Sequence, residues 1–186
     1  MTATDIIGAT WALSELILNV SRRSSPKEKT GKDKSTLGLI WLVLIISIVG
    51  GVMLAKYTHA APLKDTELAH AIGDGIIIAG MILRIAAIIM LGRFFTVDVA
   101  IRDNHRIVNT GLYRYIRHPS YTGALISFFG FGIVQNNWYS FAVVFIPVCF
   151  VMILRINVEE RALVEHFGEA YEDYRKKTWR LLPFIY

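Results

Sequence analysis

Residues 119–154 are PSYTGALISFFGFGIVQNNWYSFAVVFIPVCFVMIL, and none of these side chains is charged. A helix of about 20 apolar residues crosses the hydrocarbon core of a bilayer, so the stretch is too long for one crossing and just long enough for two. Asn136 and Asn137 divide it, and asparagine suits tight turns because it tolerates a left-handed backbone. We therefore predict a helical hairpin with arms at 121–134 and 138–154.

The rest of the chain has the same membrane character. Of its 186 residues, 54% are hydrophobic and 19% are charged, and its mean hydropathy is +0.45. The apolar residues lie in long runs, which is typical of membrane-spanning helices and not of an ordinary soluble domain. The sequence therefore predicts an all-α fold, a polytopic transmembrane helical bundle that forms one integral membrane domain over residues 1–186. Residues 1–92 supply the first spans, and residues 93–186 supply the functional half.

Three further spans are expected before the hairpin, which gives about five in total. Residues 37–55 are an uncharged apolar run, and residues 75–92 contain Arg84 as their only charge. Residues 6–20 are the weakest candidate because they are few and contain Glu15, so an interfacial helix is the alternative there. A lone intramembrane arginine is costly unless it meets a partner. We therefore expect Arg84 to pair with Glu15.

The basic residues predict how the chain is oriented. They are concentrated in residues 21–36, 93–118 and 155–186, and cytoplasmic segments of membrane proteins are rich in Lys and Arg. This pattern places the N-terminus outside and the C-terminus in the cytoplasm, and it accounts for the net charge of +5 without a nucleic-acid partner. Residues 157–177 carry apolar side chains near helical spacing, which predicts a cytoplasmic amphipathic helix that Gly168 interrupts.

Several small residues are interpreted as packing residues. Cys149 is the single cysteine and lies inside an apolar run, so it can form neither an intrachain disulfide nor a cysteine-based metal site. No cluster with the spacing of metal ligands stands out, and we predict no bound metal. Glycines allow helices to approach closely in a membrane, and this is the role expected for Gly50, Gly51, Gly130 and Gly132.

Polar side chains gather at the two ends of the predicted hairpin. A hairpin brings its own ends together, so His118 and Tyr121 at its entrance should lie near Arg155, Glu159 and Glu160 at its exit. Each residue also has a simpler interpretation. A boundary arginine can be an orientation anchor, glutamates suit the first turn of a helix, and tyrosines form interfacial belts. Together they predict a pocket that opens at the membrane boundary.

Two motifs flank the hairpin. The first, HRIVNTGLYRYIRHPSYTG at residues 105–123, closely resembles the signature of the isoprenylcysteine carboxyl methyltransferase family. The second, RINVEERAL at residues 155–163, resembles the C-terminal motif of the same family, and the spacing between the two also resembles the family's. The resemblance covers roughly residues 105–183. It implies a membrane methyltransferase that uses S-adenosylmethionine and releases S-adenosylhomocysteine.

The resemblance also implies the residues of the site. Arg155 matches the family's substrate-side arginine, and we expect it to hold an acceptor carboxylate through two parallel N–H bonds. Glu159 is the second residue expected to act in catalysis, through the ammonium or ribose hydroxyls of the cofactor. The expected cofactor-binding residues are His105, Arg106, Ile107, Val108, Tyr113, His118, Pro119, Ser120, Tyr121, Glu159 and Glu160.

The expected acceptor is lipophilic or lipidated and enters from the bilayer through an opening between helices. Carboxyl O-methylation of a prenylcysteine-like substrate is the reaction that the resemblance implies, and a carboxylate ionised at neutral pH needs no general base. Two alternatives stay open. Related phospholipid methyltransferases share parts of the pattern, but an amine acceptor would need a base such as Glu160 or His118. A non-enzymatic membrane scaffold that keeps the fold would lack cofactor affinity.

Overall fold

The computed structural model describes residues 1–22, 36–58, 60, 65–101 and 104–184. Within these residues the chain forms α-helices and two short 3₁₀ helices, η1 and η2. Their bounds are α1 Ala3–Ser21, α2 Thr36–Tyr57, α3 Thr66–Leu91, η1 Gly92–Phe94, η2 Gly111–Arg114, α4 Pro119–Val134, α5 Trp138–Phe167 and α6 Glu169–Lys176. The predicted basic segment at 21–36 lies almost wholly outside the described residues.

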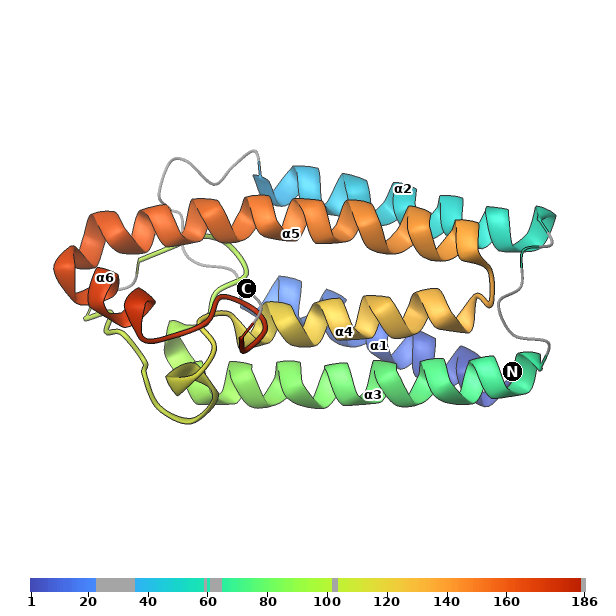
Figure 1. Ribbon diagram of the computed structural model, residues 1–186, viewed down its shortest axis with the longest axis horizontal. Coiled ribbons are helices and arrows are strands. Elements are labelled where there is room, and N and C mark those ends of the chain that lie inside the picture. The colour runs from blue at the N-terminus through green and yellow to red at the C-terminus, as the bar shows by residue number, and fades with distance from the viewer. Residues whose placement is uncertain (23–35, 59, 61–64, 102–103, 185–186) are drawn as a thin grey trace.

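Helices α1 to α5 lie lengthwise along the molecule and form a bundle (Figure 1). The chain reverses direction at each connection, so the ends of α1, α3 and α5 lie at the same end of the bundle as the beginnings of α2 and α4. The closest helix pairs are α3 with α4 and α2 with α5, while α1 packs on α3. Helix α6 and the C-terminal segment fold back over this same end. The predicted all-α membrane bundle is confirmed.

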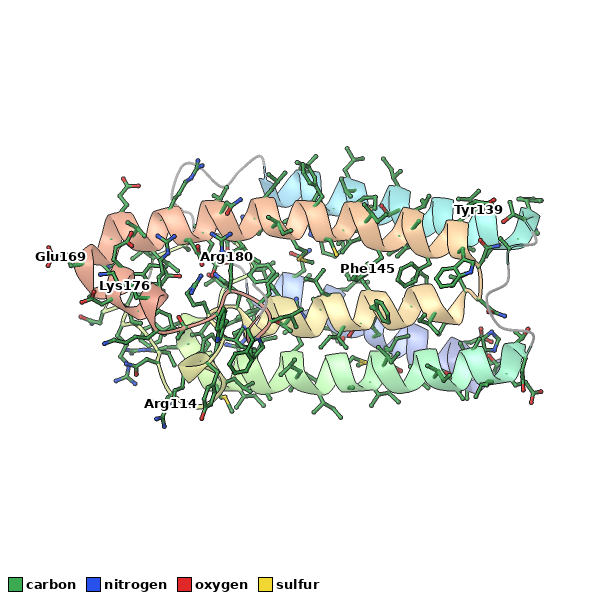
Figure 2. All side chains as sticks on the ribbon, viewed as in Figure 1. Arg114, Tyr139, Phe145, Glu169, Lys176 and Arg180 are labelled. Atoms are coloured by element: carbon green, nitrogen blue, oxygen red, sulfur yellow. The ribbon has the colours of Figure 1, made fainter. Side chains whose placement is uncertain are left out.

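Three helices in the described part of the chain are long and apolar enough to cross a membrane. They are Leu37–Tyr57, Thr66–Phe94 and Trp138–Phe167, and Pro119–Val134 is a shorter apolar helix. The side chains in the middle of the bundle are mostly carbon, whereas nitrogen and oxygen atoms concentrate toward the ends (Figure 2). The total of five spans stays a prediction, because α1 and α4 fall short of the length or hydropathy of the other three.

The predicted hairpin is confirmed as α4 and α5. Asn136 adopts the left-handed conformation, with φ 44°, and the Asn137 side-chain oxygen accepts hydrogen bonds from the backbone N–H groups of Tyr139 at 3.0 Å and Ser140 at 3.1 Å. The two asparagines therefore make the turn and cap α5.

The second arm differs from the prediction because α5 does not end at residue 154 but continues to Phe167. The predicted amphipathic helix at 157–177 is therefore the end of α5 followed by α6. Gly168, with φ 56°, separates the two, and Tyr171 is the buried residue of α6. The continuous helix carries Arg155 and Glu159 rigidly from the apolar bundle into its polar end.

Helices α3 and α4 pack with their backbones almost in contact. A Cβ atom on Gly80 would lie 2.6 Å from the carbonyl oxygen of Gly123, and one on Gly130 would lie 2.7 Å from the carbonyl oxygen of Gly73. Such distances leave no room for any side chain. Gly130 was expected from the sequence as a packing residue, whereas Gly73, Gly80 and Gly123 were not, because their partners are known only once the helices are paired.

The other packing glycines divide into two groups. A Cβ atom on Gly132 would lie 2.7 Å from the ring of Phe141, and one on Gly51 would collide with Val144. The expected role is confirmed for both. Gly50 differs, since a Cβ atom there would make an ordinary contact at 3.5 Å with Val143.

The predicted pairing of Arg84 with Glu15 is confirmed. The Arg84 guanidinium donates to a Glu15 carboxylate oxygen at 2.8 Å, and a second nitrogen–oxygen distance in this ion pair is 2.6 Å. Another nitrogen of Arg84 donates to the backbone oxygen of Ser120 at 3.0 Å. One side chain thus joins α1, α3 and the beginning of α4. The pairing removes most of the cost of an isolated charge in the membrane.

Candidate functional site

A cavity of about 340 Å³ begins at the polar end of the bundle and runs into its apolar interior. Most of the residues expected from the sequence line it. They are His105, Arg106, Ile107, Val108, Tyr113, His118, Ser120, Tyr121, Arg155 and Glu159. Pro119 and Glu160 are not among the lining residues. The structure therefore brings the two sequence motifs together around one space.

The two ends of the α4–α5 hairpin meet at this cavity. The Tyr121 hydroxyl donates to Glu159 at 2.8 Å, and His118 lies 3.2 Å from Glu160 through its Nε2 atom. The other ring nitrogen of His118 is 3.8 Å from Glu159. The sequence predicted this proximity from the hairpin alone, and the structure confirms it. A buried imidazole between two carboxylates is held in one orientation.

Aromatic side chains form one wall of the cavity. The rings of Phe94 and His105 are stacked with their centroids 4.9 Å apart, and Phe167 meets His105 edge to face at 5.5 Å. The Tyr113 hydroxyl donates to the carbonyl oxygen of Ala87 at 3.2 Å. Burial raises the pKa of Tyr113, so its hydroxyl stays a neutral donor at physiological pH. The wall offers flat apolar faces next to the Glu159 carboxylate.

Arg155 is almost completely buried, with 2% of its surface exposed. Its guanidinium donates to the carbonyl oxygen of Val97 at 2.7 Å. Val97 belongs to the segment that follows η1, and both residues line the cavity. A simple snorkelling anchor would place its charge in water. The buried position instead favours a role inside the cavity.

Glu160 is the centre of a cluster of cations behind the cavity wall. One carboxylate oxygen accepts from Arg117 Nε at 2.8 Å and lies 3.2 Å from His118 Nε2. The other accepts from two nitrogens of Arg180, at 2.5 and 3.1 Å. Glu160 is 3% exposed. Its lone pairs are therefore taken by protein groups that hold the wall of the cavity together.

The C-terminal segment completes this cluster and was not predicted from the sequence. Trp179 accepts a hydrogen bond through its backbone oxygen from Arg117 N–H at 2.8 Å, and its own N–H donates to the Tyr115 oxygen at 2.9 Å. Figure 2 shows Arg180 on this segment, beside the beginning of α4. Because this backbone pairing involves so few extended residues, it leaves no periodic pattern in the sequence from which it could be predicted.

The inner part of the cavity is apolar. It passes between α1 and α2, where its lining includes Leu16, Trp41 and Ile45, and it reaches Trp11 and Phe128. Helix α1 packs on α3 while α2 packs on α5. Leu16 and Ile45 are more than half exposed on the bundle surface. This geometry fits the opening toward the bilayer that the sequence analysis expected.

The cavity therefore joins a polar chamber to an apolar slot. Glu159 and Arg155 offer opposite charges in the chamber, which suits a cationic group and an anionic group brought face to face. The slot suits a hydrocarbon chain. In the described residues no group of three His, Cys, Asp or Glu side chains has the geometry to hold a metal ion.

Comparisons with known proteins show which family the chain resembles. Residues 73–165 match the model of the "Isoprenylcysteine carboxyl methyltransferase (ICMT) family". A fission-yeast (Schizosaccharomyces pombe) "Protein-S-isoprenylcysteine O-methyltransferase" is 36% identical over 60% of this chain and 48% of its own length. The Arabidopsis thaliana "Protein-S-isoprenylcysteine O-methyltransferase B" is 34% identical over 77% of this chain and 73% of its own.

A solved structure has the same fold. It is the "eukaryotic intramembrane Ras methyltransferase ICMT", which is 26% identical with a TM-score of 0.61 over 80% of this chain and 53% of its own. This chain thus spans about half the length of the yeast relative and of the solved protein.

Proposed function

The chain belongs to the isoprenylcysteine carboxyl methyltransferase family, and from this premise we propose that it methylates the carboxylate of a prenylcysteine-like acceptor with S-adenosylmethionine. The observation that carries the proposal is one continuous cavity that joins a charged chamber to an apolar slot. An acceptor of this class has a carboxylate, which suits the charged chamber, and a hydrocarbon chain, which suits the apolar slot. A scaffold has no need of such a cavity.

The residues of the chamber fit the cofactor. S-adenosylmethionine supplies an electrophilic methyl group on a sulfonium when it is bound. The Glu159 carboxylate matches its ammonium or ribose hydroxyls, and the rings of Phe94 and His105 suit an adenine face. The cavity volume of about 340 Å³ lies within the range of about 300–1,000 Å³ that is usual for small-molecule sites. Pro119 and Glu160 would support this wall from behind.

Arg155 is the residue that we assign to the acceptor carboxylate. Its planar guanidinium can donate two parallel N–H bonds to one carboxylate, which fixes both position and orientation. Burial strengthens this contact because little water competes inside the cavity. The Val97 carbonyl at 2.7 Å holds the guanidinium in place. Arg155 would thus present the acceptor oxygen toward the chamber that Glu159 lines.

The chemistry then depends mainly on positioning. A carboxylate with a pKa near 3.5 is ionised at neutral pH and attacks without a general base. The chain's task is to align the acceptor oxygen with the methyl group and to exclude water, both of which lower the barrier. Tyr113 lines the chamber as a neutral hydroxyl, because burial raises its pKa, so it adds no phenolate that would compete as a nucleophile.

An amine acceptor fits the site less well. An ammonium must lose a proton before it can attack, so it needs a base in contact with it. The two candidates from the sequence are His118 and Glu160, and these lie 3.2 Å from each other. Glu160 also binds Arg117 and Arg180. Glu160 is thus engaged behind the wall, and the Nε2 atom of His118 faces Glu160, which favours the carboxylate acceptor.

The decisive experiment is methyl transfer by the purified protein in lipid nanodiscs. Radiolabelled S-adenosylmethionine is supplied with an S-farnesylcysteine analogue, with its carboxyl amide, or with phosphatidylethanolamine. We expect label on the free carboxylate only, as an ester that mild base releases as methanol. Base-stable label on the phospholipid would replace the proposal with amine methylation. No transfer to any acceptor, with no binding of S-adenosylhomocysteine, would favour a scaffold.

A further inference from the structure

The apolar slot ends in the middle of the bundle at a layer of packed side chains, which we call its floor. Trp11 of α1, Phe128 of α4 and Met152 of α5 line the inner end of the cavity. The same three residues belong to the close-packed hydrophobic core that continues beyond them. Each is buried, with an exposed fraction of 5–7%. A hydrocarbon chain whose carboxylate lies in the polar chamber therefore meets a wall of packed side chains at its far end.

The depth of the slot follows from helix geometry. From His118 at the chamber to Phe128 at the floor, α4 rises about 15 Å at 1.5 Å per residue. From Glu159 back to Met152, α5 gives about 10 Å. The slot is therefore comparable in length with a prenyl chain of a few isoprene units. One more unit would have to displace the floor or leave the slot.

Trp11 is the largest side chain of this floor, and its position is fixed. Its ring meets Phe128 edge to face with centroids 4.8 Å apart. Glu15, one helical turn along α1, binds Arg84 at 2.8 Å. On the other side of Trp11, the Thr4 hydroxyl donates to buried Asp74 at 2.7 Å. Two polar contacts with α3 thus hold α1 on both sides of the ring, so the ring cannot slide along the slot.

We propose that Trp11 limits the length of the acceptor's hydrocarbon chain. This inference rests on the proposed function, because it assigns a specificity-determining residue to that same site. Residues 73–165 match the family model, so α1 and its tryptophan lie outside the matched part. A smaller residue at position 11 opens space toward Ile7, the next inward residue of α1. That space is about one helical turn long, which accommodates one further isoprene unit.

The test compares two variants that change the slot in opposite directions. Trp11→Leu lengthens it, whereas Ala124→Val narrows it above the floor, since Ala124 lines the slot one turn before Phe128. The measurement is the ratio of kcat/KM for S-geranylgeranylcysteine to that for S-farnesylcysteine, in nanodiscs. We expect Trp11→Leu to raise this ratio about tenfold, the low end of what apolar pockets discriminate, and Ala124→Val to lower it.

Leu13→Ala is the matched control, because Leu13 lies on the same helix and is 58% exposed. It should leave the ratio unchanged. General destabilisation cannot shift one ratio in two directions, and binding of S-adenosylhomocysteine verifies that each variant is folded. Equal ratios in wild type, Trp11→Leu and Ala124→Val would overturn the inference while leaving the proposed function intact. Failure of the wild type to methylate any prenylcysteine would overturn both.

Discussion

Buried and half-buried charges at the polar end of the bundle are balanced residue by residue. Arg84 is paired with Glu15, and Glu160 lies among Arg117, His118 and Arg180. Such clusters rarely add much stability compared with apolar packing, but breaking one leaves an uncompensated charge. Their value here is positional, because the same residues adjoin the cavity wall. Each pair can therefore be tested for its effect on structure or on chemistry.

Replacing Glu160 with Gln should destabilise the protein without removing a group from the cavity. The substitution keeps the shape of the side chain but leaves the half-buried guanidinium groups of Arg117 and Arg180 without their counter-charge. We expect a loss of about 3 kcal/mol in the free energy of unfolding. Thermal unfolding in detergent, followed by circular dichroism, measures it. Glu165→Gln, at an exposed position of the same helix, is the control, and equal midpoints for both variants would contradict the account.

Replacing Arg155 with Lys should weaken the use of the acceptor and spare the cofactor. Lysine keeps the positive charge but cannot donate two parallel N–H bonds. Loss of one charge-assisted bond, about 1.5–3 kcal/mol, predicts a fall of roughly tenfold or more in kcat/KM for S-farnesylcysteine. Affinity for S-adenosylhomocysteine should stay the same. Arg161→Lys, at an exposed position on the same helix, is the control and should change neither value. An unchanged kcat/KM in Arg155→Lys would show that Arg155 does not bind the acceptor.

At the scale of elements, the hairpin and its glycine contacts determine where the site forms. The Asn136–Asn137 turn brings the ends of α4 and α5 together, and α5 continues without a break through Arg155 to Glu159. Helix α3 supports α4 through the Gly80–Gly123 and Gly73–Gly130 contacts. Because these backbones nearly touch, α4 has little freedom to move relative to Arg84.

The glycine contact predicts a large difference between two similar substitutions on α3. A Cβ atom on Gly80 would lie 2.6 Å from the backbone of Gly123, whereas one on Gly75 would meet nothing within 4 Å. Gly80→Ala should therefore force the helices apart and cost about 1–3 kcal/mol of unfolding free energy. Gly75→Ala should be neutral or slightly stabilising, since alanine favours a helix. Unfolding midpoints in detergent give both values, and equal stability of the two variants would refute the close contact.

At the scale of the whole molecule, α6 lies at the end of the bundle opposite the beginnings of α1 and α3 (Figure 1). The chamber belongs to the same end as α6, because Tyr171 and Tyr174 of α6 line the cavity. We propose that the chamber end faces the cytoplasm, following the distribution of Lys and Arg. A cofactor made in the cytoplasm would then reach the chamber directly. The acceptor chain would enter from the bilayer between α1 and α2.

Cysteine labelling tests this orientation. In a Cys149→Ser background, Glu67→Cys places a thiol at the beginning of α3, and Glu169→Cys places one at the beginning of α6. Both positions are exposed. A membrane-impermeant maleimide applied to intact cells should label Glu67→Cys, while Glu169→Cys should react only after permeabilisation. The reverse pattern would invert the proposed orientation, and labelling of both in intact cells would contradict a spanning bundle.

Much of this architecture could be predicted from one sequence because it depends on long apolar runs and on local turn chemistry. The hairpin, the Arg84–Glu15 pair and the meeting of Tyr121 with Glu159 followed from those signals. Apart from the Arg84–Glu15 pair, which a lone charge in an apolar run requires, contacts that depend on how separate elements pack could not be predicted. The pairing of Trp179 with Arg117, the role of Glu160 as the centre of a cation cluster, and the Trp11 floor all belong to this second class. Each joins residues far apart in the chain through geometry that no local pattern records.

The central claim is that the chamber beside Glu159 binds the methyl donor. Calorimetric titration of the detergent-purified protein with S-adenosylhomocysteine tests it most directly, with Glu159→Ala compared with Glu165→Ala on the same helix. We predict binding in the micromolar range by the wild type and by Glu165→Ala, and a loss of roughly tenfold or more in Glu159→Ala, since a charge-assisted hydrogen bond contributes about 1.5–3 kcal/mol. Absence of binding by folded wild-type protein, or equal affinity in all three, would contradict the claim.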